Sequence, residues 1–238
     1  MKQRSLCTII AALASLLLIG SEARAQRDVP RFEIGVQFSL LNLDRPRSQI
    51  GDFVLQPGDF SGYGAESGFG ARFTYNVTNH IALEAEGNFF TRQINDFGVP
   101  GGQIYQGQFG VKAGKRFKKV GLFIKIRPGF VRFTKVSQFT GFSDLAITNT
   151  LHHQQPEFRT GTATYFSADL GGVLEFYPSR RIVTRLDVGD TIIRYGIYRE
   201  PEGIVCTLTA DVCPASLYER PAETRHNLQF SAGIGIRF

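Results

Sequence analysis

The chain has 238 residues, of which 20% are charged, and it carries a net charge of +6 at pH 7. This positive excess is mild and falls to +4 without residues 1–25, so the chain lacks the dense basic face of a nucleic-acid-binding protein. Mean hydropathy is −0.09, and no stretch after residue 25 approaches about 18 consecutive apolar residues, which excludes a helical membrane span.

Residues 1–25 have the layout of a secretory signal peptide. Lys2 and Arg4 precede an apolar run over residues 8–20, and Ala23-Arg24-Ala25 has the small-x-small pattern of a cleavage site. We therefore expect an exported chain that is cut after Ala25 and that keeps residues 26–238 as one domain.

Eight later segments alternate between apolar and polar residues. A period of two places successive side chains on opposite faces of a β-strand, so each segment predicts a strand with one apolar and one polar face. In chain order the predicted strands cover residues 31–43, 68–77, 80–93, 104–117, 120–134, 163–177, 181–195 and 227–238. The last strand is the most regular, with Phe230, Ile234 and Phe238 on its apolar face. Such a strand suits a wall between lipid and a polar interior.

Two strands contain residues that a regular strand disfavours. Pro128 cannot donate a hydrogen bond to a neighbouring strand, so we expect a bulge or a local break there. In the seventh strand, strict alternation would place Asp190 on the apolar face, where a charge is costly in lipid. We therefore predict a bulge at Gly189 that turns Asp190 inward and sends Ile193 and Tyr195 outward.

The connections between strands alternate between short and long. Residues 78–79, 118–119 and 178–180 predict tight turns, whereas residues 44–67, 94–103, 135–162 and 196–225 predict long loops. In outer-membrane barrels the short turns are periplasmic and the long loops lie outside the cell. The sequence therefore predicts an all-β fold, an eight-stranded antiparallel up-and-down transmembrane β-barrel in the cell outer membrane, with both termini periplasmic.

The polar faces carry charges of both signs in equal number. The alternation of each strand places six acidic and six basic side chains on the inward polar face. The acidic ones are Glu33, Glu84, Glu86, Asp169, Glu175 and Asp187, and the basic ones are Arg72, Lys112, Lys125, Arg127, Arg185 and Arg237. The interior of an eight-stranded barrel is just wide enough for side chains to fill, and buried charges persist only when they are paired. We expect an ion-paired plug in the lumen; the alternative is a narrow solute or ion conduit in which the pairs exchange partners.

Cysteine and histidine residues in the expected loops have simple interpretations. Cys206 and Cys213 lie close together in a chain expected to meet oxidising conditions, so we predict a disulfide, with two free thiols as the alternative. His152 and His153 have no further ligands at metal-site spacing, so we expect a solvated pair. We expect no metal and no other cofactor.

The strand number, the alternation and the terminal Phe238 resemble those of the small eight-stranded outer-membrane β-barrels, similar to the membrane domain of the OmpA family and to OmpX-like proteins. The resemblance covers residues 26–238 and rests on pattern. It implies that the barrel-assembly machinery reads the last strand, with Phe238 as the assembly signal. We expect a monomer with a structural or surface-interaction role, in contact with membrane lipid and lipopolysaccharide, whose loops are available to an extracellular protein or another surface partner.

Two other classes of protein share parts of this pattern. Some eight-stranded barrels are lipid hydrolases, and His226 lies at the expected outer rim, but their His-x-Ser-Asn signature is absent because Asn227, Leu228 and Gln229 follow. We therefore expect no enzymatic activity. A soluble lipocalin-like barrel would enclose the apolar face and expose the polar one. The charged and glycine-rich polar face does not suit the interior of a site for a greasy ligand.

Basic residues gather at the expected periplasmic turns. Lys115, Arg116, Lys118 and Lys119 flank one turn, and residues 180–181 supply two arginines in the next. We expect these residues to contact anionic lipid headgroups; the alternative is ordinary solvated charge on a turn.

Overall fold

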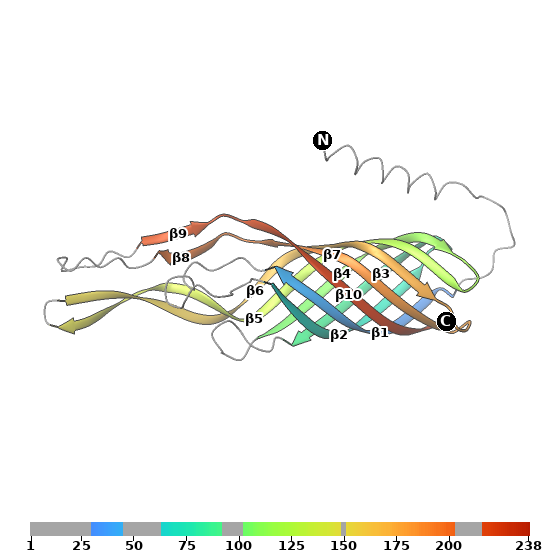
Figure 1. Cartoon of the computed structure of the whole chain (residues 1–238), viewed down its shortest axis with the longest axis horizontal. Helices are drawn as coiled ribbons and strands as arrows, with labels where there is room; N and C mark the ends of the chain where they lie inside the picture. The colour runs from blue at the N-terminus through green and yellow to red at the C-terminus, as the bar shows by residue number, and fades with distance from the viewer. Residues whose placement is uncertain (1–29, 45–62, 92–101, 149–150, 203–215) are drawn as a thin grey trace, which may run out of the picture.

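The computed structural model describes residues 30–44, 63–91, 102–148, 151–202 and 216–238 (Figure 1). The strands in these ranges are β1 (Phe32–Asp44), β2 (Tyr63–Asn76), β3 (Ile81–Thr91), β4 (Gln103–Arg116), β5 (Val120–Thr148), β6 (Leu151–Phe176), β7 (Ile182–Tyr195), β8 (Tyr198–Glu202), β9 (Ser216–Arg220) and β10 (Glu223–Arg237). Eight of them close into an antiparallel barrel in the order β1-β10-β7-β6-β5-β4-β3-β2, and β8 pairs with β9 in a separate ribbon. The predicted eight-stranded antiparallel barrel is confirmed.

The alternation of the sequence sets the two faces of the barrel wall. In β1, Val36 is 62% exposed on the outside, whereas its neighbour Gln37 is 4% exposed and faces the lumen. The same alternation runs through β3, β4 and β7. Because side chains of a strand point alternately to its two faces, an apolar-polar repeat in a closed sheet gives an apolar outside and a polar inside.

The barrel closes between its first and last strands. β1 and β10 pair in one register from Glu33 opposite Arg237 to Leu41 opposite Gln229. Beyond Arg237, Phe32 and Phe238 exchange two backbone hydrogen bonds of 2.9 Å, and their rings stack with centroids 5.9 Å apart. This pairing leaves no open edge in the barrel, so its strands have no row of unpaired backbone groups.

Three tight turns lie at one end of the barrel, as predicted. In the first, the hydroxyl of Thr78 accepts hydrogen bonds from the backbone N–H groups of His80 (3.1 Å) and Ile81 (3.0 Å). In the third, the hydroxyl of Ser179 accepts from Arg181 and Ile182 in the same way. We call this the turn end and the opposite end the loop end. The C-terminus lies at the turn end (Figure 1).

The predicted loop at residues 135–162 is wrong. β5 and β6 continue past the barrel as a long hairpin that extends from the loop end (Figure 1). Three register shifts interrupt its ladder, and Lys135 at the first has a φ of 54°. The two strands are already paired within the barrel, so extending the ladder requires no new loop closure. Part of the predicted loop 196–225 likewise forms β8 and β9.

The predicted bulge at Gly189 is also wrong. β7 pairs with β6 and with β10 without a register shift, so Asp190 faces outward. Its carboxylate accepts a hydrogen bond of 3.1 Å from the backbone N–H of Asn227, and it lies 2.6 Å from Nδ1 of His226. These partners on β10 stabilise the outward carboxylate, so the strand stays regular.

Pro128 produces a local break without a bulge. The β4–β5 ladder is interrupted between the pair Gln108–Gly129 and the pair Val111–Ile126, and the register is the same on both sides. The missing N–H of proline removes one bond of the ladder, and the intact pairing of β5 with β6 holds the strand in place. Cys206 and Cys213 lie outside the described residues.

The closure can be tested with a cysteine pair. Ser39 on β1 and Ser231 on β10 are direct partners, and their hydroxyl oxygens are 2.8 Å apart in the lumen. In a chain with Cys206 and Cys213 replaced by Ser, we expect Ser39→Cys with Ser231→Cys to form a disulfide on oxidation. The measurement is a mobility shift of the boiled protein on a gel without reductant.

The matched control moves one cysteine along the strand. Ser39→Cys with Gln229→Cys displaces the second thiol by two residues and is expected to stay reduced under the same conditions. Equal cross-linking of the two pairs would contradict the register of the closure.

Candidate functional site

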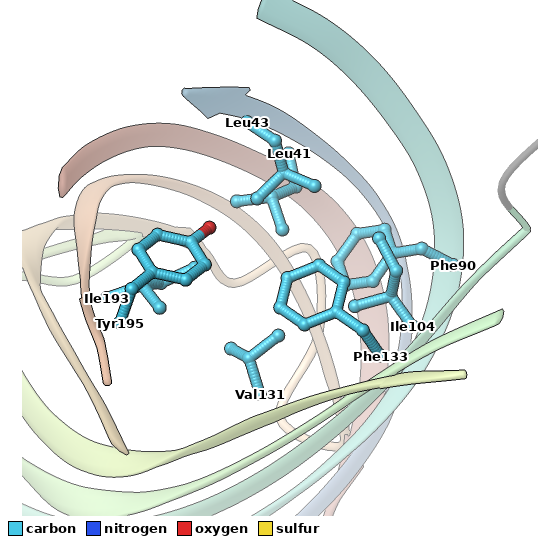
Figure 2. Close-up of a cluster of buried hydrophobic side chains, with 8 residues drawn as sticks. All are labelled: Leu41, Leu43, Phe90, Ile104, Val131, Phe133, Ile193 and Tyr195. Carbon is cyan, nitrogen blue, oxygen red and sulfur yellow. The ribbon is translucent and has the colours of Figure 1, made fainter. Parts of the chain in front are cut away.

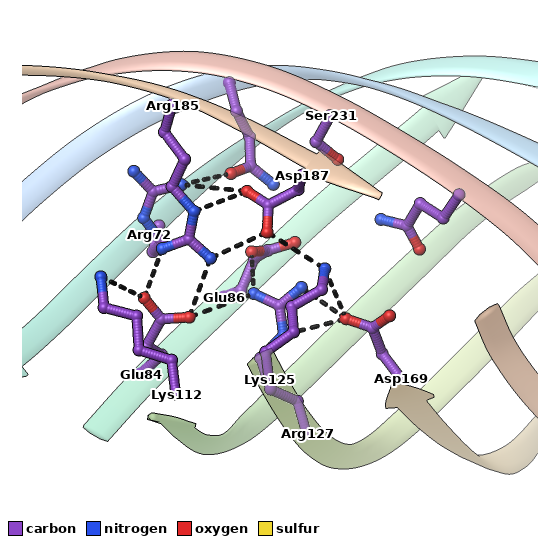
Figure 3. A network of polar contacts seen from close by, with 12 residues as sticks. Arg72, Glu84, Glu86, Lys112, Lys125, Arg127, Asp169, Arg185, Asp187 and Ser231 are labelled. Atoms are coloured by element: carbon purple, nitrogen blue, oxygen red, sulfur yellow. Dashed lines mark hydrogen bonds and ion pairs between the residues drawn. The ribbon is translucent and has the colours of Figure 1, made fainter. Parts of the chain in front are cut away.

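The twelve charged residues predicted to face the lumen all point into the barrel. They come from all eight barrel strands and are between 0% and 7% exposed: Glu33, Arg72, Glu84, Glu86, Lys112, Lys125, Arg127, Asp169, Glu175, Arg185, Asp187 and Arg237. Most of them meet in one network of polar contacts (Figure 3). The network fills the part of the lumen nearer the turn end.

Glu84 on β3 contacts three cations from three other strands. Arg185 on β7 donates two hydrogen bonds to its carboxylate, one from Nη1 and one of 3.0 Å from Nη2. Nζ of Lys112 lies 3.2 Å from the same carboxylate and also pairs with Glu175, and Nη1 of Arg127 lies 3.6 Å from it. A carboxylate with no exposed surface therefore sits among several positive charges, as a buried anion requires.

A second group surrounds Asp169 on β6. Nε of Arg127 donates to Oδ2 of Asp169 at 3.0 Å, and Nζ of Lys125 lies 2.8 Å from the same oxygen. Lys125 also lies 3.1 Å from Asp187, which accepts hydrogen bonds of 2.6 Å and 2.9 Å from Arg185. Because Arg185 and Arg127 both reach Glu84, the two groups form one network.

Arg72 and Glu86 connect this network to the amides above it. Nη1 of Arg72 donates to the side-chain oxygen of Gln37 at 3.1 Å. Glu86 pairs with Nη1 of Arg127 and accepts a hydrogen bond of 2.8 Å from the side-chain amide of Asn88. Nη1 of Arg72 also lies 3.8 Å from Asp187, so both residues contact an ionic and an amide partner.

The floor of the lumen at the turn end contains two residues absent from the predicted set, Arg116 and Tyr177. Nε of Arg116 donates to the Tyr177 oxygen at 3.2 Å, and the Tyr177 hydroxyl donates to Glu175 at 2.7 Å. Burial and the Glu175 carboxylate together raise the pKa of Tyr177 above its ordinary value, so the phenol remains a donor. Nη2 of Arg116 lies 3.8 Å from Glu33.

Arg237 belongs to this floor and not to the ionic network. Its guanidinium lies 4.3 Å from the ring centroid of Tyr177, and Nη2 donates to the backbone oxygen of Ser179 at 3.2 Å. The expectation that Arg116 contacts lipid headgroups is wrong, because its side chain points into the lumen and pairs there. The Gly-x-Arg-Phe pattern that it shares with Arg72 and Arg237 is the sequence signal for this inward orientation.

A layer of uncharged polar side chains lies on the loop-end side of the ionic network. The amide of Gln37 donates to Asn88 at 2.9 Å, Asn88 donates to Gln106 at 2.8 Å, and Gln106 donates to Gln229 at 2.9 Å. The hydroxyl of Thr191 also donates to Gln229, at 2.8 Å. Because these residues come from β1, β3, β4, β7 and β10, the amide chain crosses the whole lumen.

An apolar cluster that the sequence pattern did not predict lies in the loop-end part of the lumen (Figure 2). Its buried members are Leu41, Leu43, Phe90, Ile104, Val131, Phe133, Ile193 and Tyr195. Tyr165 packs against it, with ring centroids 4.8 Å from Tyr195 and 5.9 Å from Phe133. The prediction that Ile193 and Tyr195 point outward is wrong, because β7 has no bulge and keeps both on the inner face.

Neither a helical span nor a metal site is found in the part of the chain that the structure describes. No helix there is long and apolar enough to cross a membrane. No group of three or more His, Cys, Asp or Glu residues among the described ones has the arrangement needed to hold a metal ion.

The fold and the lumen define the chain as a small eight-stranded β-barrel with a charged interior and an apolar outer wall. The resemblance to small eight-stranded outer-membrane barrels is thereby confirmed at the level of fold. No protein-family model and no curated protein matches the sequence.

Several solved structures are similar to this chain. Ail, the attachment invasion locus protein of Yersinia pestis, in complex with the heparin analogue sucrose octasulfate, has a TM-score of 0.46 at 11% identity, over 89% of this chain and 100% of that one. The outer membrane protein OprG from Pseudomonas aeruginosa has a TM-score of 0.46 at 12% identity, over 90% and 98%. The N-terminal β-barrel domain of Pseudomonas aeruginosa OprF has a TM-score of 0.42 at 8% identity, over 89% and 100%.

The contribution of the ionic network to the stability of the barrel can be measured by replacing Arg185. We expect Arg185→Met to lower the free energy of unfolding by about 3–5 kcal/mol, because the buried Glu84 and Asp187 would each lose a counter-charge. The measurement is urea unfolding in lipid vesicles, followed by tyrosine fluorescence.

The control is Arg194→Met, which removes an exposed arginine from the outer face of the same strand. Its effect is expected to stay below about 1 kcal/mol. An equal effect of the two substitutions would contradict the assignment of Arg185 to a buried network.

Proposed function

We propose that this protein is an outer-membrane β-barrel with a closed lumen and a structural or surface-interaction role that it performs at its loop end. The observation that carries the proposal is the filling of the lumen at three successive heights. Ion pairs occupy the turn-end part, hydrogen-bonded amides the middle, and apolar side chains the loop end. A lumen filled in this way leaves the outer wall and the loop end as the surfaces on which the protein acts.

The outer wall supports a membrane location. Large hydrophobic side chains are exposed on all eight barrel strands, among them Phe69 (71%), Val36 (62%) and Phe166 (61%). A contiguous apolar surface of this extent marks a membrane or protein interface. The export signal that we propose for residues 1–25 is consistent with that location. The proposed barrel domain covers residues 26–238.

The ends of the barrel support an orientation. Phe32 and Phe238 lie together at the turn end, and in outer-membrane barrels the short turns are periplasmic. We propose that both termini are periplasmic and that Phe238 serves as the signal for the barrel-assembly machinery. The proposed protein is a monomer in contact with lipid and lipopolysaccharide, and a Cys206–Cys213 disulfide remains a prediction.

One contact on the outer wall bears on the alternative of a lipid hydrolase. The pair of His226 and Asp190 on the outer wall has the 2.6 Å contact of a general base and its orienting carboxylate. However, Leu228 occupies the next outward position on β10, and Ser231 faces the lumen, where its hydroxyl contacts Ser39. The pair therefore lacks a serine at these positions, and we infer no enzymatic role from it.

The closed lumen is tested by recording current across planar bilayers. We expect no steady conductance from the folded protein, because ion pairs, hydrogen-bonded amides and apolar side chains fill the lumen at successive heights. The triple variant Arg127→Ala with Gln229→Ala and Phe133→Ala removes a large side chain from each of the three layers and is expected to conduct.

The protein for these recordings is taken from outer membranes, and its folding is checked by faster gel migration before boiling than after it. A heat-modifiable wild type with steady conductance that changes on Arg127→Ala would favour the conduit over the plug. A wild type recovered from the periplasm without a heat shift would contradict the membrane location.

The surface role is tested on the hairpin of β5 and β6. Val136 and Gly161 are partners at its base, so replacing residues 137–160 by a two-residue Asn-Gly turn shortens the hairpin and leaves the barrel strands intact. We expect the shortened protein to keep its heat shift and to lose surface attachment or envelope integrity in cells. Unchanged attachment and integrity would contradict a role for this hairpin.

A further inference from the structure

An apolar groove of about 510 Å³ crosses the outer wall over β5, β6, β7, β10 and β1. Two small outward residues, Gly172 and Ala232, form its floor. Its apolar outward-facing walls are Phe38, Leu40, Leu122, Leu174, Leu186, Val188 and Phe230. A Cβ atom added at Gly172 would meet its nearest atoms only at 4.0 Å, so the space directly above this glycine is open.

The register of the strands gives the groove a direction. Phe38, Ala232, Leu186, Leu174 and Leu122 are successive partners across the five strands. Leu122 lies two residues after the first residue of β5 at the turn end, whereas Phe38 lies six residues into β1. The groove therefore begins at the turn end on β5 and rises toward the loop end on β1.

Basic residues surround the turn end of the groove. Lys115 on β4 is the next partner in the same row, opposite Leu122, and is exposed on the outer wall. Lys118 and Lys119 form the adjoining turn and are also exposed. The backbone N–H of Tyr177 donates to the oxygen of Lys119 at 2.9 Å, which holds this turn against the next one.

The third tight turn, over residues 178–180, adds Arg180 and the adjacent Arg181, both exposed. Within residues 115–122 and 172–188, all of which are described, the acidic residues are Glu175 and Asp187, and both face the lumen. The outer side of the groove's turn end is therefore positively charged, and it adjoins an apolar channel.

We propose that this groove binds one acyl chain of an anionic phospholipid, whose phosphate is held by Lys115, Lys118 and Lys119. The proposal rests on the proposed membrane location, in which the turn end meets lipid headgroups. An acyl chain fits the chemistry of the walls, and basic residues beside a membrane attract anionic headgroups. The groove and the lysines together distinguish this site from the rest of the apolar wall.

A second hollow provides an internal comparison. It measures about 590 Å³ and lies over β2, β3, β4 and β5, with Gly87 and Gly107 among its outward lining residues. No charged residue lines it. A Cβ atom added at Gly87 would meet nothing within 4 Å, so a larger residue at this position can fill the second hollow, as one at Gly172 can fill the first.

The test is native mass spectrometry of the full mature barrel, titrated with dioleoyl phosphatidylglycerol or with dioleoyl phosphatidylethanolamine. We expect phosphatidylglycerol to bind about tenfold or more tightly than phosphatidylethanolamine. Lys115→Gln with Lys118→Gln and Lys119→Gln should remove that preference. Gly172→Leu should weaken binding of both lipids, because it fills the groove.

Two matched variants serve as controls. Gly87→Leu fills the second hollow, and Arg132→Gln with Arg159→Gln and Arg194→Gln removes three exposed charges toward the loop end. Both should leave the affinity for phosphatidylglycerol unchanged. If Gly172→Leu does not fold, the triple lysine variant and Ala232→Leu carry the test.

Equal affinity of the wild type for the two lipids, or equal loss in the lysine and the arginine variants, would overturn the proposal. Displacement of phosphatidylglycerol by glycerol 3-phosphate would also overturn it, since a free phosphate would then suffice without the acyl chain. The heat shift of each sample separates these outcomes from failure of the proposed membrane location, because it reports the folded barrel without reference to lipid preference.

Discussion

Charged side chains that point into an eight-stranded barrel are largely buried, so most of them need a partner on another strand. Lys112 and Lys125 illustrate the constraint. They are direct partners in the β4–β5 ladder, an unfavourable pairing by itself, but Lys112 meets Glu84 and Lys125 meets Asp169. The contact of Glu84 with Arg185 joins β3 to β7 across the lumen. The network therefore helps to fix how strands far apart in the sequence face one another.

The order of the layers along the axis makes this network possible. The apolar cluster around Phe133 lies on the loop-end side of the network, and Arg116, Tyr177 and Arg237 lie on its turn-end side. Electrostatic attraction is stronger in an interior from which water is excluded, and an unpaired charge there is more costly. The amide layer connects the ionic network to the apolar cluster, because amides hydrogen-bond to the ionic groups on their turn-end side and to one another.

The sequence predicted the inner and outer faces well, since a period of two leaves only two choices for each strand. It could not predict which inward charges pair, because alternation within one strand does not fix its height relative to the others. It failed at Asp190, where the cost of an outward charge was judged without the neighbouring His226. It also missed the apolar cluster, because Leu41 and Phe133 lie on faces that are polar elsewhere. In both cases the deciding information lay on another strand.

The outer wall is apolar throughout, but its small residues are not equivalent. The ring of Phe130 covers Gly107, so a side chain built at that glycine would collide with it. Gly172 has no such cover, and the row of partners that runs past it ends at Lys115. A hollow in a lipid-facing wall is filled by acyl chains, and the charge at its end decides which headgroup accompanies the chain. With the lumen closed as proposed, the lipid selectivity that we propose for this barrel resides on its outer surface, where apolar shape and fixed charge meet.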